Sequence, residues 1–96
     1  MHTLSFSAET GTLPRLHQIE GRPTTSLIQK EEGTIVELDA GLWGIMYRRH
    51  SVLPVNLPAA LRRTGVRVHF SGELKQVSTA EFWAALPVVL TAIHEV

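Results

Sequence analysis

The chain has 96 residues, no cysteine and a formal net charge of zero. This length supports one domain with a single small core, and the missing cysteine excludes disulfides, thiolate metal sites and cysteine nucleophiles. A zero net charge excludes a global field that attracts nucleic acid or anionic membranes. No apolar run reaches the length of a membrane span, and the first residues lack the basic and apolar regions of a leader.

Residues 1–32 mix Ser, Thr, Gly, Pro and Glu with isolated apolar side chains, and no hydrophobic period holds for long. We expect a loosely ordered N-terminal arm over 1–32, with residues 25–29 forming an edge strand if they are ordered. From Gly33 onward the sequence has the residue types of β-strands and turns. β-Branched residues 34–38 lead through a turn at 39–41 into residues 42–48, which predicts a β-hairpin, and Gly44 suggests a bend or bulge there.

The stretch 51–72 predicts a strand, a short helix and a second strand. Asn56 is a favourable N-cap, Pro58 suits a first helical turn, and Gly65 suits the position after the last turn, so we expect a helix over about 57–64. Apolar residues at 66, 68 and 70 alternate with polar ones, as in a half-buried strand.

The C-terminal part predicts a final strand over 87–96, which is β-branched and mostly apolar. Residues 80–86 are ambiguous. Ser78 and Glu81 match a capping box that favours a helix, whereas the same residues also suit the entry to the final strand, which we prefer.

Five strands with a helix between the third and the fourth predict a mainly β fold, a five-stranded OB-like Greek-key barrel over residues 33–96. An SH3-like barrel is the nearest rival. The motifs Trp43-Gly-Ile45, Pro54–Pro58 and Gly65–Gly72, followed by Trp83, Pro87 and Ile93, resemble small bacterial OB-like domains of uncharacterised function that occur mainly in exported proteins and lipoproteins. The resemblance implies no catalytic residues. The chain departs from the pattern in lacking a lipobox cysteine and in having Ala84-Ala85 where a glycine is expected. The compartment therefore stays open between exported, with the leader removed, and cytoplasmic.

Residues 48–75 form a basic block, with six basic side chains against one acidic, a net charge of +5. OB-folds bind ligands on the face of strands 2 and 3 and in the adjoining loops. The candidate ligand-binding residues are therefore aromatic or basic side chains of this region: Trp43, Tyr47, Arg48, Arg49, His50, Arg62, Arg63 and Arg67. The competing interpretation assigns Trp43 and Tyr47 to the core, Arg62 and Arg63 to the helix C-terminus, and the other arginines to solvated surface.

No pattern in the sequence predicts an enzyme, a metal site or a cofactor. The five histidines show no paired metal-ligand spacing. His69 and His94 lie on neighbouring predicted strands, where the acidic residues they could approach are Glu81 or Glu95, and scattered surface histidines are the preferred interpretation. We therefore expect a non-enzymatic binding module for a protein or glycan surface. The alternatives are weak binding of single-stranded nucleic acid through the strand 2–3 face, and a structural role in which the arm or a sheet edge joins copies of the chain.

Overall fold

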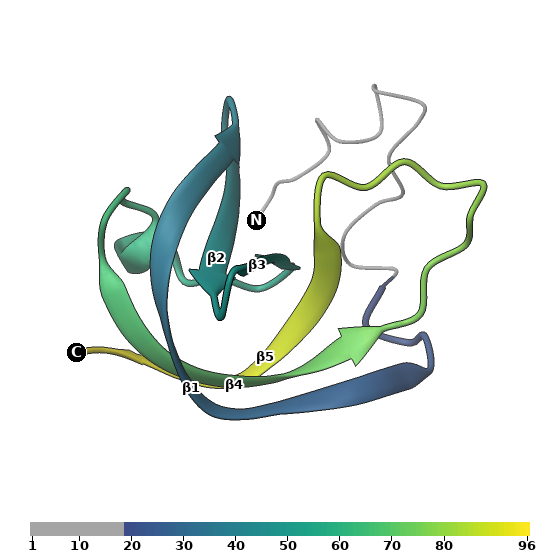
Figure 1. Cartoon of the computed structure of the whole chain (residues 1–96), viewed down its shortest axis with the longest axis horizontal. Helices are drawn as coiled ribbons and strands as arrows, with labels where there is room; N and C mark the ends of the chain where they lie inside the picture. Colours follow the sequence, from purple (N-terminus) through teal and green to yellow (C-terminus); the bar gives the residue numbers. More distant parts are fainter. Residues whose placement is uncertain (1–18) are drawn as a thin grey trace.

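Five β-strands form the fold in the computed structural model, which describes residues 19–96 (Figure 1). The expected mainly β character and strand number are confirmed. The elements are β1 (Thr24–Asp39), β2 (Leu42–Tyr47), β3 (His50–Pro54), the 3-10 helix η3 (Ala59–Leu61), β4 (Arg67–Lys75) and β5 (Leu86–Glu95). No helix within residues 19–96 is long and apolar enough to cross a membrane.

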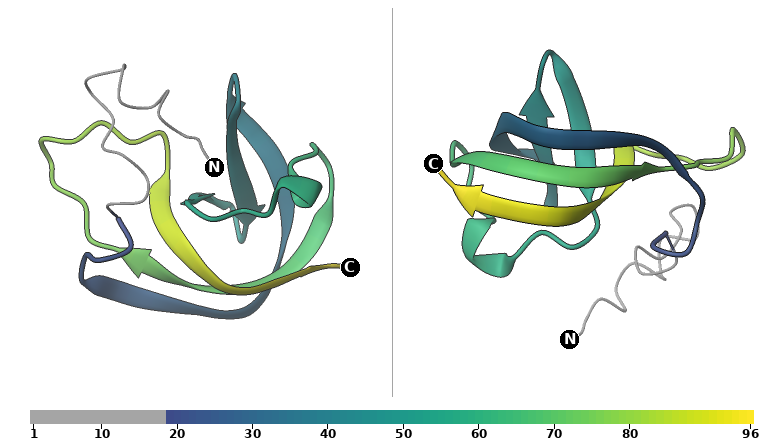
Figure 2. Two further views of the ribbon diagram at one scale, coloured as in Figure 1. Left: turned by 180° about the vertical axis from the view of Figure 1, so that it is seen from behind. Right: turned by 90° about the horizontal axis from the view of Figure 1, so that it is seen from below.

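The strands close into a ring in the order β1-β2-β3-β5-β4, with β4 returning to β1. All neighbouring pairs are antiparallel except β3 and β5, which run parallel. β1, β4 and β5 lie side by side across one part of the ring (Figure 2). The short parallel pair, in which Val52–Pro54 align with Leu86–Val88, completes the ring.

β1 is a single strand of 16 residues that pairs first with β4 and then with β2. The expected strand 25–29 is therefore the first half of β1, and the boundary drawn after residue 32 falls inside a continuous strand. The part of the expected arm over 1–18 lies outside the described residues. Gly33 lies where the pairing of β1 changes from β4 to β2. A Cβ added at Gly33 would lie 2.5 Å from Ile45 Cγ2 and 3.0 Å from the Met46 carbonyl oxygen. This close approach lets β1 curve from one partner to the other.

The core fills the inside of the ring with aliphatic side chains and Phe70. Ile35, Ile45, Val68 and Val88 are fully buried, and the alternation expected at 66, 68 and 70 is confirmed. The bulge between β1 and β2 lies near Leu38 rather than at Gly44. Gly44 instead leaves room for the Leu38 side chain, whose Cδ1 would lie 2.7 Å from an added Cβ.

The prediction of a helix over 57–64 is wrong, because the structure has only a single 3-10 turn there, at Ala59–Leu61. Asn56 does not cap this turn. Its side chain instead bonds both backbone groups of Leu90, accepting from the N–H at 2.8 Å and donating to the carbonyl at 3.0 Å, and so ties the segment after β3 to β5. Gly65 then turns with φ of +93° and its N–H donates to the Ile35 carbonyl, which returns the chain to the sheet before another helical turn forms.

Residues 76–85 form the β4–β5 loop, so neither the preferred strand nor the alternative helix over 80–86 is present. The capping-box bonds do form. The Ala80 N–H donates to Ser78 Oγ at 3.1 Å, and the Ser78 N–H donates to Glu81 Oε1 at 3.2 Å. They stabilise an isolated turn, because the residues after Glu81 leave helical geometry immediately.

Candidate functional site

The β2–β3 turn carries two of the predicted arginines at its tip. Arg48 and Arg49 both adopt positive φ, 47° and 68°, in a two-residue hairpin turn that normally favours Asn or Gly. The Arg48 guanidinium makes two bonds to Glu31 on β1, at 3.0 and 2.9 Å. Arg49 has no hydrogen-bond or ion-pair partner among residues 19–96.

The other predicted arginines are engaged locally. Arg62 donates to the Leu57 carbonyl at 3.1 and 3.3 Å, which precedes the 3-10 turn, so this contact is not the one with a helix C-terminus that the sequence suggested. Arg63 contacts the Ala60 carbonyl and Glu95, and Arg67 pairs with Glu32 on β1. The basic block is thus divided among separate partners and is not gathered into one free cationic patch.

The predicted aromatic residues lie against the core. Trp43 and Tyr47 are partly buried and pack on it. The Tyr47 ring meets Phe70 edge to face, with centroids 5.3 Å apart, and lies 6.3 Å from the exposed His50 ring. Burial, with a smaller contribution from Glu31, raises the pKa of the Tyr47 hydroxyl. This packing favours a structural role over an open stacking platform.

Glu81 organises a cluster that sequence reasoning did not single out as a site. Its carboxylate accepts from both terminal nitrogens of Arg22, at 2.7 Å for the Nη1 contact, and from Trp83 Nε1 at 3.0 Å. Together with the Ser78 N–H, these donors lower the pKa of Glu81 from 4.5 to about 2, and the Arg22 contact is the largest cause. The sequence indicated this residue through the capping box and as an acidic neighbour of His69 or His94, whereas the structure pairs it with Arg22 and places Glu32 beside His69.

Lys75 forms a second anchor beside this cluster. Its side chain is 7 % exposed, and Nζ donates to the Arg22 carbonyl, Thr24 Oγ1 and Glu73 Oε1 at 3.0–3.1 Å. The contact with Lys75 is the main cause that lowers the pKa of Glu73. Lys75 thus joins the start of β1 to the end of β4. The sequence gives no sign of this, because a lysine at a strand end normally points to solvent.

The β4–β5 loop is therefore held at its start by Lys75 and in its middle by Glu81, and it still presents apolar surface. Phe82 is 73 % exposed and Leu86 49 % exposed, although their neighbours Glu81 and Trp83 are bonded. A depression of about 310 Å³ lies beside the loop, between Arg22-Pro23 and Gln76–Ser78. The loop and η3 lie at opposite ends of the molecule in both views (Figures 1 and 2), so Arg62 and Arg63 do not belong to the same site.

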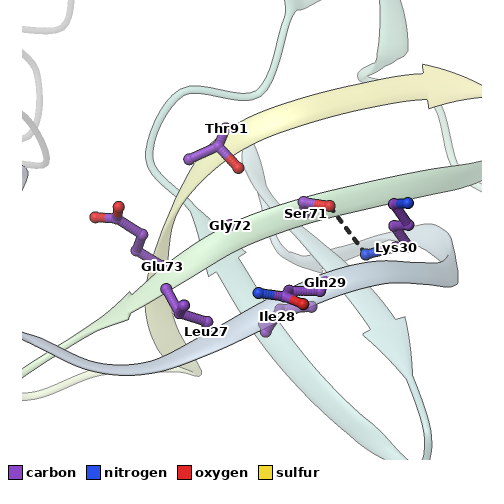
Figure 3. A pocket seen from close by; sticks show the side chains of 8 residues that line it. All are labelled: Leu27, Ile28, Gln29, Lys30, Ser71, Gly72, Glu73 and Thr91. Carbon is purple, nitrogen blue, oxygen red and sulfur yellow. Dashed lines mark hydrogen bonds between the residues drawn. The ribbon is translucent and has the colours of Figure 1, made fainter.

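A second depression, of about 330 Å³, lies on the sheet where the register of β1 and β5 shifts (Figure 3). Lys30 has φ of 52° there, and its N–H donates to Ser71 Oγ at 2.9 Å across to β4. The lining residues are Leu27–Lys30, Ser71–Glu73 and Thr91. The depression coincides with the two bulges, which interrupt the regular pairing of β4 with its neighbours.

A scan against protein-family models matches no family, and a search of curated proteins finds no similar one.

Proposed function

We propose that this chain is an OB-like β-barrel that acts as a protein-binding module through its β4–β5 loop. The strand order, the long first strand shared by β2 and β4, and the parallel β3–β5 pair support the OB-like assignment. The 3-10 turn η3 takes the place that the expected helix would occupy between β3 and β4.

The observation that carries this function is the exposure of Phe82 on a loop that is already fixed. Ordering a flexible loop opposes binding, and the bonds of Glu81 remove much of this cost before a partner arrives. An exposed aromatic ring supplies a large apolar area for a partner's pocket, as anchoring residues at protein interfaces do. Leu86, at the far end of the loop, extends the apolar contact.

The arrangement of the arginines favours a protein over single-stranded nucleic acid as the ligand. Phosphate binding depends on cations that can replace counterions, whereas Arg48, Arg63 and Arg67 already face carboxylates. The half-buried Trp43 and Tyr47 offer little open ring surface for bases.

The test compares partners captured by the wild-type chain and by Phe82→Ser, followed by affinity measurements with each purified partner. We expect a protein partner whose Kd rises at least about thirtyfold with Phe82→Ser, the size of an interface hot spot. Met46→Ser is the matched control, because Met46 is 44 % exposed on β2, outside the loop and outside the β1 edge.

Equal losses in the two variants would contradict the proposal, as would a partner that Phe82→Ser binds at wild-type affinity. An oligonucleotide bound with salt-dependent affinity, or a glycan bound independently of Phe82, would replace it with the corresponding alternative.

The free edge of β1 supports a second candidate function, assembly of copies of this chain. Residues 24–31 pair with β4 on one edge, and their other edge has no strand partner within residues 19–96. Residues 24–29 carry no charge, so two copies of this edge can pair antiparallel without like charges opposing each other.

A further inference from the structure

His69 and His94 form a cross-strand pair on the outside of the sheet. They are directly opposite each other in the β4–β5 register, and Glu32 on β1 is directly opposite His69. The three side chains therefore form a row across adjacent strands. His69 Nδ1 and His94 Nε2 are 3.4 Å apart, and the rings are inclined at 72°.

We propose that this pair binds a borderline transition-metal cation, Zn²⁺, Ni²⁺ or Cu²⁺, through His69 Nδ1 and His94 Nε2. Two nitrogens that each lie 2.0–2.1 Å from a tetrahedral zinc are about 3.4 Å apart, which is the separation between the two facing nitrogens. Imidazole is a preferred ligand of these ions. The site differs from the proposed protein-binding loop and does not depend on it.

Glu32 occupies the position of a supporting carboxylate. If His69 binds metal through Nδ1, its proton lies on Nε2, and Glu32 Oε1 is 3.9 Å from that nitrogen. A carboxylate that accepts a hydrogen bond from the second nitrogen of a ligating histidine fixes its tautomer and orients its ring, and Glu32 would approach by about 1 Å to accept that bond. Arg67, which lies two positions before His69 on β4, pairs with the same carboxylate and holds Glu32 in place.

The pair supplies two ligands, because residues 19–96 contain no group of three or more His, Cys, Asp or Glu side chains suited to hold one ion. Water or a second molecule would complete the coordination. Both imidazoles are accessible from solvent, the His69 side chain being 44 % exposed. We therefore expect an exchangeable site and not a tightly closed structural one.

The test is calorimetric titration of the full chain with zinc, nickel or copper salts, with magnesium as a hard cation that prefers oxygen ligands. We expect one borderline ion per chain and no magnesium binding. His69→Gln and His94→Gln should each weaken binding at least tenfold. A variant with His2, His17 and His50 all changed to Gln should bind as the wild type does. Far-UV circular dichroism without metal checks the fold of every variant.

Glu32→Gln and Arg67→Gln form a matched pair for the role of the carboxylate. Both remove the same surface ion pair, but only Glu32→Gln removes the group that faces His69. We expect about tenfold weaker binding with Glu32→Gln and little change with Arg67→Gln. Absence of binding by the wild-type chain would overturn the metal site. The same conclusion would follow if the triple variant lost binding while His69→Gln and His94→Gln both kept it. Equal effects of Glu32→Gln and Arg67→Gln would remove Glu32 from it.

Discussion

At the scale of single residues, Glu81 makes the stability of this protein depend on pH. Its pKa is lowered from 4.5 to about 2 in the folded chain, so the folded state binds fewer protons than the unfolded state between these values. The stabilisation is complete above pH 4.5 and is lost as the pH falls towards 2.

We therefore expect Glu81→Gln to lose less stability than the wild type between pH 5 and pH 2.5, as measured by urea unfolding followed by tryptophan fluorescence. Glu20→Gln is the control, since Glu20 is exposed and has no bonded partner among residues 19–96. Identical pH profiles for Glu81→Gln and the wild type would show that Arg22 does not retain the carboxylate in its charged form.

At the scale of elements, the β2–β3 turn carries backbone strain. Arg49 has φ of 68°, a conformation that costs a residue with a Cβ of order 1 kcal/mol or more, and its side chain has no described partner to compensate. Arg49→Gly should raise the free energy of unfolding by about 1 kcal/mol, as measured in urea. Arg49→Ala keeps the Cβ and should not. Stabilisation by both variants would point to charge rather than backbone strain.

Gly33 controls the curvature of β1. A Cβ at this position meets Ile45 and a backbone oxygen within 3.0 Å, so Gly33→Ala should lower the free energy of unfolding by about 1–3 kcal/mol or more. Gly21→Ala provides the comparison, because nothing lies within 4 Å of its added Cβ. Similar unfolding curves for the two variants would mean that β1 shifts without cost.

The differences between the expected and observed elements have a common cause. The alternation of apolar and polar residues over 66–70 predicted β4, because one face of this strand is buried. Local signals failed where a distant partner contributes to the structure. Asn56 bonds Leu90 in place of a helix end, and Glu81 bonds Arg22 as well as the Ser78 N–H, with no helix after the turn. The same limit applies to the candidate site. Aromatic and basic types identified Trp43, Arg48 and their neighbours, but the sequence does not show which carboxylate each arginine meets.

At the scale of the whole molecule, we propose that copies associate through the edge of β1 that has no strand partner within residues 19–96. Leu27 is 59 % exposed on the uncharged segment 24–29, and we expect wild-type chains to form dimers at high concentration through this edge. Leu27→Lys should weaken the dimer at least tenfold in sedimentation equilibrium. Met46→Lys is the control, since Met46 is 44 % exposed on β2. A wild-type chain that stays monomeric, or equal effects of the two variants, would contradict this assembly.

The parallel β3–β5 pair also bears on how fast the chain folds. The pairs β1–β2 and β2–β3 are consecutive hairpins. Val52, in contrast, pairs with Leu86, 34 positions further along the chain, and Thr24 pairs with Lys75 across a longer separation. Contacts between distant residues form slowly, because the intervening chain loses entropy before they stabilise it. We expect the β1–β3 meander to form early and β5 to dock late. Val88→Ala should then speed unfolding and leave the refolding rate nearly unchanged in stopped-flow measurements.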